Sequence, residues 1–203
     1  HSHLIMQNQK FSNLDGKKVT ITQTGSYLET IGVMKISDSG VTTELIANYR
    51  EVDEKAIAAS EIVVDAVNAE LNKVIAVNDN ALYINDAMDS KTRLVRRMGT
   101  NMSDLVSDSV YWYVNDVIDL DCDIAITNGG GIRTDIKKGD FTYLSAANVL
   151  PFGNVICLVK VTGQQIKDML EWSVRDLPDT ENGGLLHAAG VTFNVNTAIE
   201  STI

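Results

Sequence analysis

The stretch Asn128-Gly129-Gly130-Gly131-Ile132-Arg133 follows a short apolar run, Asp123-Ile124-Ala125-Ile126-Thr127, that is typical of a buried strand. Three consecutive glycines carry no Cβ atom, so the chain can turn sharply and a ligand can approach its backbone closely. An amide stands just before the glycines and a guanidinium just after them, at a strand end, where open α/β sheets bind ligands. The pattern predicts either a polar ligand site or a tight turn followed by a surface arginine.

A helix is predicted directly before this strand, beginning near Asn101 or Ser103. One apolar stripe runs along it at helical spacing, formed by Val106, Val110, Val114 and Val117. Its aromatic residues, Trp112 and Tyr113, are expected in the core or at its rim. The order of helix, strand and glycine-rich turn is typical of the α/β class.

A second candidate site is the loop Pro151-Phe152-Gly153-Asn154, in which an aromatic ring and an amide flank a glycine. Its simpler interpretation is a proline turn with Phe152 in the core. Before this loop we expect extended chain at Phe141-Thr142-Tyr143. A short helix, Ala146–Val149, should follow, capped by Ser145 and ended ahead of Pro151.

The segment after this loop predicts a strand, then a helix, then a last pair of strands. One face of the strand is apolar and consists of Val155, Cys157, Val159 and Val161, which predicts a buried thiol. Thr162 and Gln165 have the spacing of a capping box and open the helix. The last strands are expected within Gly190–Val195. His187 has no acidic or nucleophilic neighbour in a motif, so we interpret it as structural.

The N-terminal quarter of the chain differs in character from the rest. Alternating residues predict strands at Lys18–Thr24, Leu28–Ile36 and Val41–Ala47, which we interpret as the closing strands of a sheet. Apolar residues at helical spacing then predict a helix over Asp53–Val74, with Asp53 as its N-cap. This helix is either a crossover within one domain or a connector between two domains.

Composition limits the classes of function. A chain of 203 residues with 44% hydrophobic content can bury a sizeable core. The formal charge of −10 excludes a nucleic-acid polymer as the expected partner, although a single nucleotide needs only a few local cations. The one basic cluster, at residues 91–97, is either a solvated patch or such a local site. No stretch approaches the about 20 apolar residues of a membrane span. Because the chain begins at His1 rather than at methionine, we expect a fragment of a longer protein.

Five motifs in this order resemble the C-terminal domain of the 5′-nucleotidase family, which includes ecto-5′-nucleotidase and bacterial UDP-sugar hydrolase. They are Arg96, Asn101-Met102, the stretch at 128–133, Leu150-Pro151-Phe152-Gly153-Asn154, and Val161-Thr162-Gly163. The resemblance covers about residues 92–195. It implies an α/β fold, an α+β mixed sheet with flanking helices, for a nucleotide-binding C-terminal domain. A helix would join this domain to the last strands of a metallophosphoesterase sandwich.

The resemblance also implies that the chain divides into three parts. Residues 1–47 would be the C-terminal end of the metallophosphoesterase domain and residues 48–75 the connecting helix. Residues 76–203 would be the substrate-binding domain, truncated before the family's later loop with its second stacking aromatic. At the other end, His1 and His3 are either a tag or a disordered terminus, or, as the resemblance implies, the last ligands of a site for two divalent ions such as Zn or Mn.

The nucleotide site implied by the resemblance consists of seven residues: Arg96, Asn128, Gly130, Gly131, Arg133, Phe152 and Asn154. Phe152 would stack on the base, and the two asparagines would bind the base or ribose. The two arginines would hold the ribose and phosphate end, and the glycine backbone would let the nucleotide lie close. Two features depart from the family pattern: Ser103 stands where glycine is usual, and Arg93 and Arg97 flank Arg96.

The activity implied is hydrolysis of nucleoside 5′-phosphates to nucleoside and phosphate by the complete protein, in an extracellular, periplasmic or cell-surface location. Two metals about 3.5–4 Å apart would supply the hydroxide in the other domain, so this chain alone would hold no catalytic residue and be inactive. Three alternatives remain: a 2′,3′-cyclic-nucleotide phosphodiesterase, a UDP-sugar hydrolase, or a surface module that binds nucleotides without catalysis.

Overall fold

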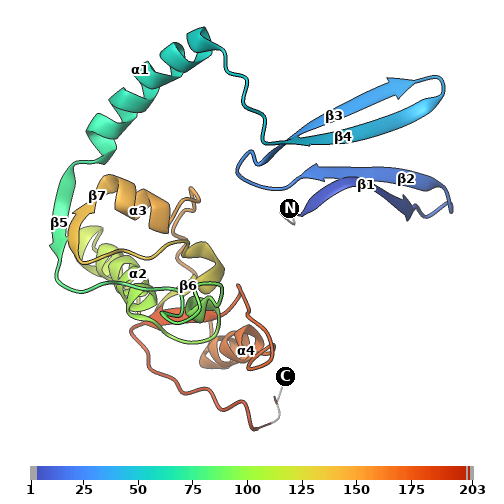
Figure 1. The fold of residues 1–203 in the computed structure, drawn as a ribbon. Helices are drawn as coiled ribbons and strands as arrows, with labels where there is room; N and C mark the ends of the chain where they lie inside the picture. The colour runs from blue at the N-terminus through green and yellow to red at the C-terminus, as the bar shows by residue number, and fades with distance from the viewer. Residues whose placement is uncertain (1–3, 200, 202–203) are drawn as a thin grey trace. The chain divides into compact units, whose positions relative to one another are not determined.

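The computed structural model describes residues 4–199 and 201. The chain divides into two compact units, one up to Val63 and one from Val64 onward (Figure 1). Within the described residues, no helix combines the length and the apolar character needed to cross a bilayer.

The first unit consists of two antiparallel hairpins. The first hairpin pairs β1 (Ile5–Ser12) with β2 (Lys18–Thr24), and the second pairs β3 (Thr30–Ser37) with β4 (Gly40–Ala47). The two hairpins are linked by the Thr43 hydroxyl, which donates to the Gln7 carbonyl at 2.6 Å. The strand predicted from Leu28 begins later, because Leu28 lies in a turn with φ 59°. None of the described residues of this unit is buried.

Helix α1 (Glu54–Leu71) contains the boundary between the two units. Asp53 is its N-cap as predicted, since its carboxylate accepts from the N–H groups of Lys55 and Ala56. The predicted end at Val74 is wrong: the helix stops at Leu71, and Val74 opens strand β5 (Val74–Asn78). Apolar residues spaced three and four positions apart do not show where a helix ends when an apolar strand follows it, because the first apolar residue of the strand continues the spacing.

The second unit contains two small antiparallel sheets with helices against them. Strand β5 pairs with β7 (Gly139–Thr142), and β6 (Ala125–Asn128) pairs with β8 (Leu186–Ala189). Helix α2 (Asn101–Trp112) packs against both β6 and β8 and continues into η2 (Tyr113–Val117). Helices α3 (Tyr143–Val149) and α4 (Gly163–Ser173) complete the unit. This combination of helices and sheet agrees with the predicted α/β class.

The core of this unit includes the residue that directly follows the glycine run. Its buried members come from the loop before α2, from α2, from the end of the glycine run and from α3: Ile84, Val95, Met102, Val106, Ile132, Ile136 and Val149. Ile132, which directly precedes Arg133, is fully buried. The glycine run is therefore anchored to the core at its C-terminal end.

Two strand predictions in this unit are wrong. Residues 155–161 form no ladder with any described strand; Val155 is 82% exposed, and the Cys157 thiol is exposed rather than buried. Without a neighbouring strand, an alternating pattern has no sheet face to bury. The last predicted strand was placed too late, because β8 occupies Leu186–Ala189 and ends at Gly190, where φ is 82°.

The helix starts were located to within a few residues. Thr162 and Gln165 form the capping box of α4 as predicted. In α3 the N-cap is Thr142, so Ser145 is the third residue of the helix and Tyr143 is helical rather than extended. In α2 the N-cap is Thr100, paired with Ser103. Ser103, which replaces the glycine usual in the family, thus contributes a capping hydroxyl.

Candidate functional site

The glycine run forms η3 (Gly129–Gly131) at the end of β6, and two of its glycines are required by the protein's own packing. A Cβ on Gly129 would lie 2.0 Å from the Val95 carbonyl oxygen, and one on Gly130 would lie 2.8 Å from the Gly183 carbonyl oxygen. A Cβ on Gly131 would meet only the Asn128 side chain, with its oxygen at 3.4 Å. Gly131 is thus the glycine that leaves open space beside the backbone.

Asn128 is tied to a loop that is distant in the sequence. Its Nδ2 donates to the Gly183 carbonyl at 2.9 Å, and the Gly130 N–H donates to the same oxygen at 2.8 Å. The Gly129 N–H donates to the Leu185 carbonyl. Residues 183–185 therefore form one wall against the glycine run and fix the orientation of the Asn128 amide.

Arg133 and Phe152 lie face to face. The Arg133 guanidinium carbon is 5.8 Å from the centroid of the Phe152 ring, and its Nη1 donates to the Gly130 carbonyl at 3.2 Å. Phe152 is 51% exposed, which excludes the interpretation that places it in the core. The Arg133 N–H donates to Val149 at the end of α3, so the glycine run and the second candidate loop are brought together. Asn154 is exposed, and its N–H donates to the Phe152 carbonyl.

Arg96 reaches the same region from η1 (Leu94–Arg96). Its guanidinium carbon would be 3.9 Å from a Cβ on Gly183, the residue whose carbonyl holds Asn128. The Arg96 Nε is buried and has no hydrogen-bond partner among the described residues. A buried donor without a partner is costly in a folded protein, so this nitrogen is a candidate ligand contact.

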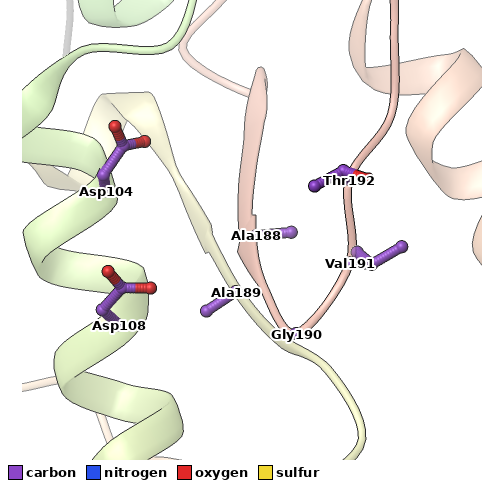
Figure 2. A pocket seen from close by; sticks show the side chains of 7 residues that line it. All are labelled: Asp104, Asp108, Ala188, Ala189, Gly190, Val191 and Thr192. Carbon is purple, nitrogen blue, oxygen red and sulfur yellow. The ribbon is translucent and has the colours of Figure 1, made fainter.

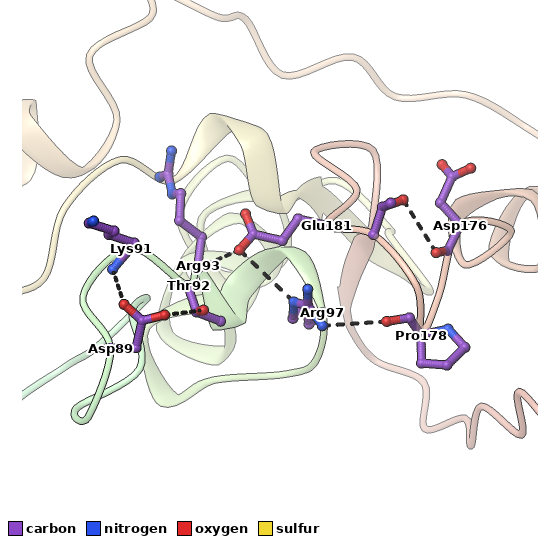
Figure 3. Close-up of polar contacts among 9 residues, drawn as sticks. Asp89, Lys91, Thr92, Arg93, Arg97, Asp176, Pro178 and Glu181 are labelled. Atoms are coloured by element: carbon purple, nitrogen blue, oxygen red, sulfur yellow. Dashed lines mark hydrogen bonds and ion pairs between the residues drawn. The ribbon is translucent and has the colours of Figure 1, made fainter.

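Arg93 adds a third guanidinium beside those of Arg96 and Arg133. The sequence predicted no role for it in the site. It donates through Nη2 to the Ile132 carbonyl at 2.7 Å, and its N–H donates to the Glu181 carboxylate at 2.8 Å (Figure 3). Burial lowers the pKa of Arg93 below its ordinary value, the charges of Arg96 and Arg133 lower it further, and Glu181 and Asp135 partly oppose them. Three arginines therefore share one positive region that two carboxylates compensate only in part.

Asp135 was also not predicted from the sequence. Its carboxylate accepts hydrogen bonds from the backbone N–H groups of Ile84 and Asn85 and from the Asn85 amide. These contacts hold the loop before η1 against the segment that carries Arg133. The partners lie about 50 residues apart in the sequence, and no local motif marks them.

One cavity of the second unit lies away from these residues. It has a volume of about 570 Å³ and is lined by Asp104 and Asp108 of α2 and by residues 188–192 (Figure 2). Two carboxylates at its wall disfavour an anionic ligand. None of the seven predicted site residues lines this cavity.

The two predicted metal ligands, His1 and His3, lie outside the described residues. Among residues 4–199 and 201, no three or more His, Cys, Asp or Glu side chains gather as a metal site would require. Two imidazoles alone are too few for two ions, each of which takes four or more ligands. The described residues therefore do not account for a pair of metal ions.

Comparison with known proteins identifies the class. The pattern of the family described as 5′-nucleotidase, C-terminal domain, matches residues 74–202. Trifunctional nucleotide phosphoesterase protein YfkN of Bacillus subtilis (strain 168) is 30% identical over 97% of this chain and 14% of its own length. NAD 5′-nucleotidase of Haemophilus influenzae is 27% identical over 96% of this chain and 31% of its own length.

A solved structure shows the same fold. The crystal structure of a 5′-nucleotidase precursor from Thermus thermophilus matches with a TM-score of 0.56 and 26% identity, over 90% of this chain and 36% of that one. The chain thus spans 14% to 36% of the length of these three relatives. The chain belongs to the 5′-nucleotidase family, as its motifs predict, and residues 74–202 are the C-terminal domain that defines the match.

Proposed function

We propose that this chain is the substrate-recognition part of a metal-dependent nucleotide phosphohydrolase that converts nucleoside 5′-phosphates to nucleoside and phosphate. The observation that carries the proposal is the pairing of Arg133 with a half-exposed Phe152 beside the glycine run. A flat apolar ring next to a cation offers one surface for a base and one for an oxyanion.

Each residue of the site takes a role that suits its contacts. Phe152 stacks on the base, and Asn154, on the same exposed loop, hydrogen-bonds to the base or ribose. Asn128 presents its oxygen toward the ligand, because its Nδ2 is engaged by Gly183. The nucleotide passes close to Gly130 and Gly131, where the backbone carries no side chains.

The arginines hold the ribose and phosphate end of the nucleotide. The Arg96 Nε, buried and without a partner among the described residues, gains one from the ligand. Arg133 keeps most of its donors free, since the one side-chain hydrogen bond that the structure gives it goes to Gly130. A guanidinium presents five N–H donors in a planar fork that matches phosphate oxygens.

We further propose the roles of the remaining parts. Residues 1–47 are the end of a metallophosphoesterase domain, in which His1 and His3 would be among the ligands of two divalent ions that supply the hydrolytic chemistry when bound. Residues 48–75 connect it to the substrate-binding domain at 76–203. The exposed apolar side chains of the hairpins, such as Ile31 and Ile36, support a unit that packs against further structure. The Thermus thermophilus relative is described as a 5′-nucleotidase precursor, and we propose an extracellular, periplasmic or cell-surface location for the complete protein.

The deciding experiment separates and quantifies the products formed by the complete gene product: nucleoside and phosphate from AMP, a nucleoside monophosphate from a 2′,3′-cyclic nucleotide, and UMP with a sugar 1-phosphate from a UDP-sugar. AMP, a 2′,3′-cyclic nucleotide and a UDP-sugar are assayed with and without a chelator. We expect chelator-sensitive hydrolysis that is fastest with AMP. Preference for either other substrate would move the assignment to the corresponding activity, binding without turnover would indicate a non-catalytic nucleotide module, and chelator-insensitive hydrolysis would refute the metal-dependent mechanism.

A further inference from the structure

His187 is a buried titratable residue that the proposed function does not use. It lies on β8, is 6% exposed, and places its Nε2 2.9 Å from the Val95 carbonyl oxygen. A carbonyl oxygen only accepts hydrogen bonds, so Nε2 must carry the proton. Burial is the main cause that lowers the pKa of His187, and the hydrogen bond to Val95 and the charge of Asp104 on α2 oppose it. The residue is thus held as a neutral donor.

The acceptor of this hydrogen bond is the peptide group that joins Val95 to Arg96. The Val95 oxygen contacts both the His187 ring and Gly129: a Cβ on Gly129 would lie 2.0 Å from this oxygen and 3.1 Å from the His187 Nε2. On the other side of the same residue, the Val95 N–H donates to the Ile84 carbonyl at 3.0 Å. Val95 itself is fully buried. Neighbouring groups therefore confine the Val95 backbone from opposite directions.

Arg96 is fixed on its C-terminal side as well, because its carbonyl accepts from the Asn182 N–H at 3.0 Å. With both flanking peptides held, the direction of the Arg96 side chain depends on these few contacts. A guanidinium on a long side chain aims accurately only when its backbone is held, since the side chain itself has several rotatable bonds.

We propose that His187 is a positioning residue: by donating to the Val95 carbonyl it locks the backbone of Arg96 and aims the Arg96 guanidinium at the nucleotide. The inference rests on the proposed function of the site and adds a residue that touches no ligand. Loss of the donor leaves the Val95 oxygen buried and unpaired, and the peptide relieves this by rotating, which turns Arg96 away.

The test is a double-mutant cycle in the complete gene product, with AMP affinity measured by calorimetry in the presence of a chelator. His187→Gln keeps a hydrogen-bond donor of similar reach. In His187→Met the side chain has almost the same shape as glutamine but carries no donor. We expect His187→Met to weaken AMP binding about tenfold and His187→Gln to restore it to within about threefold of wild type. In a protein that already carries Arg96→Ala, adding His187→Met should weaken AMP binding further by less than about twofold.

Controls separate positioning from general damage. Val106→Ala removes core volume without removing any hydrogen-bonding group, and it should lower stability with unchanged AMP affinity. Should His187→Met fail to fold, His187→Asn, whose shorter amide ends before Val95, replaces it in the cycle with the same expectation. Additive effects of His187 and Arg96 variants, or failure of His187→Gln to restore binding, would overturn the inference. A wild-type protein that binds no AMP would refute the proposed function, and this inference with it.

Discussion

At the scale of single residues, Arg133 and Phe152 form a pair that the fold leaves half open. The ring is 51% exposed and gains little from burial, so its place in the structure adds little to stability. The guanidinium is held by one hydrogen bond to the Gly130 carbonyl and lies within 5.8 Å of the ring centroid. The pair thus contributes little to the stability of the fold, in keeping with the role in ligand binding that we propose for it.

Replacement of either residue by alanine should therefore affect binding more than folding. We expect Phe152→Ala and Arg133→Ala each to weaken AMP affinity by about 1–3 kcal/mol, through lost stacking and lost charged hydrogen bonds. The free energy of unfolding should change by less than about 1 kcal/mol. Calorimetric titration with AMP and urea unfolding of the same samples measure the two quantities.

The chain offers a matched control for this pair. Trp172 is 62% exposed, and the Arg175 guanidinium carbon lies 4.4 Å from its ring centroid. Trp172→Ala removes an exposed aromatic residue from an equivalent cation–π pair outside the site, so AMP affinity should stay at the wild-type value. A Phe152→Ala variant that unfolds like a core mutant but binds AMP normally would contradict the assigned role.

At the scale of elements, the glycine run is a joint between β6, η1 and the loop that begins at Gly183. Gly129 faces the Val95 carbonyl, Gly130 faces the Gly183 carbonyl, and Gly131 faces open space beside Asn128. The three glycines thus differ in what they permit, although they are identical in the sequence.

Alanine substitutions should expose this difference. Gly129→Ala places a Cβ 2.0 Å from a backbone oxygen and forces η1 to shift, at a cost of about 3 kcal/mol or more. Gly131→Ala makes only an ordinary contact with Asn128 and should cost less than about 1 kcal/mol. Urea unfolding of both variants measures the difference. Equal losses would show that the run is a plain turn without close packing.

The sequence predicted most elements of this joint because their signals are local. The strand ending at Asn128 and the capping box at Thr162 follow from patterns within a few residues. The seven proposed site residues were found through the order of their motifs, and their roles remain predictions. Partners such as Glu181 for Arg93, 88 residues away, leave no local pattern and could not be found. The strand predicted at 155–161 is absent for a related reason. A strand forms only beside a neighbouring strand, and the local sequence does not show whether such a neighbour exists.

At the scale of the whole molecule, the second unit depends on a buried neutral histidine. The pKa of His187 in the folded protein is lowered from 6.5, chiefly by burial, whereas in the unfolded chain it keeps its ordinary value. Above pH 6.5 neither state binds the proton. Between the lowered pKa of the folded protein and pH 6.5, the unfolded chain binds the proton and the folded protein does not, so stability falls as the pH decreases through this interval.

Urea unfolding between pH 7.5 and 5.5 should therefore show a loss that depends on this residue. We expect the wild type to lose stability at a rate of at most about 1.4 kcal/mol per pH unit from this group, beyond the loss seen in His187→Gln. His187→Gln is the matched control because every carboxylate and every other histidine is retained. Identical pH profiles of the two proteins would show that His187 is not held neutral.

The contacts that tie η1 and the glycine run to residues 181–187 have a consequence for synthesis of the protein. Val95 and His187 are separated by 92 positions, and Asn128 and Gly183 by 55. A nascent chain on the ribosome can form α2 long before residues 181–187 emerge from the exit tunnel, whereas β6 still lacks its partner strand β8. During that interval the arginine cluster lacks Glu181, and the Arg96 backbone lacks its supports. The proposed nucleotide site is therefore assembled late in translation, after most of the domain's helices have emerged.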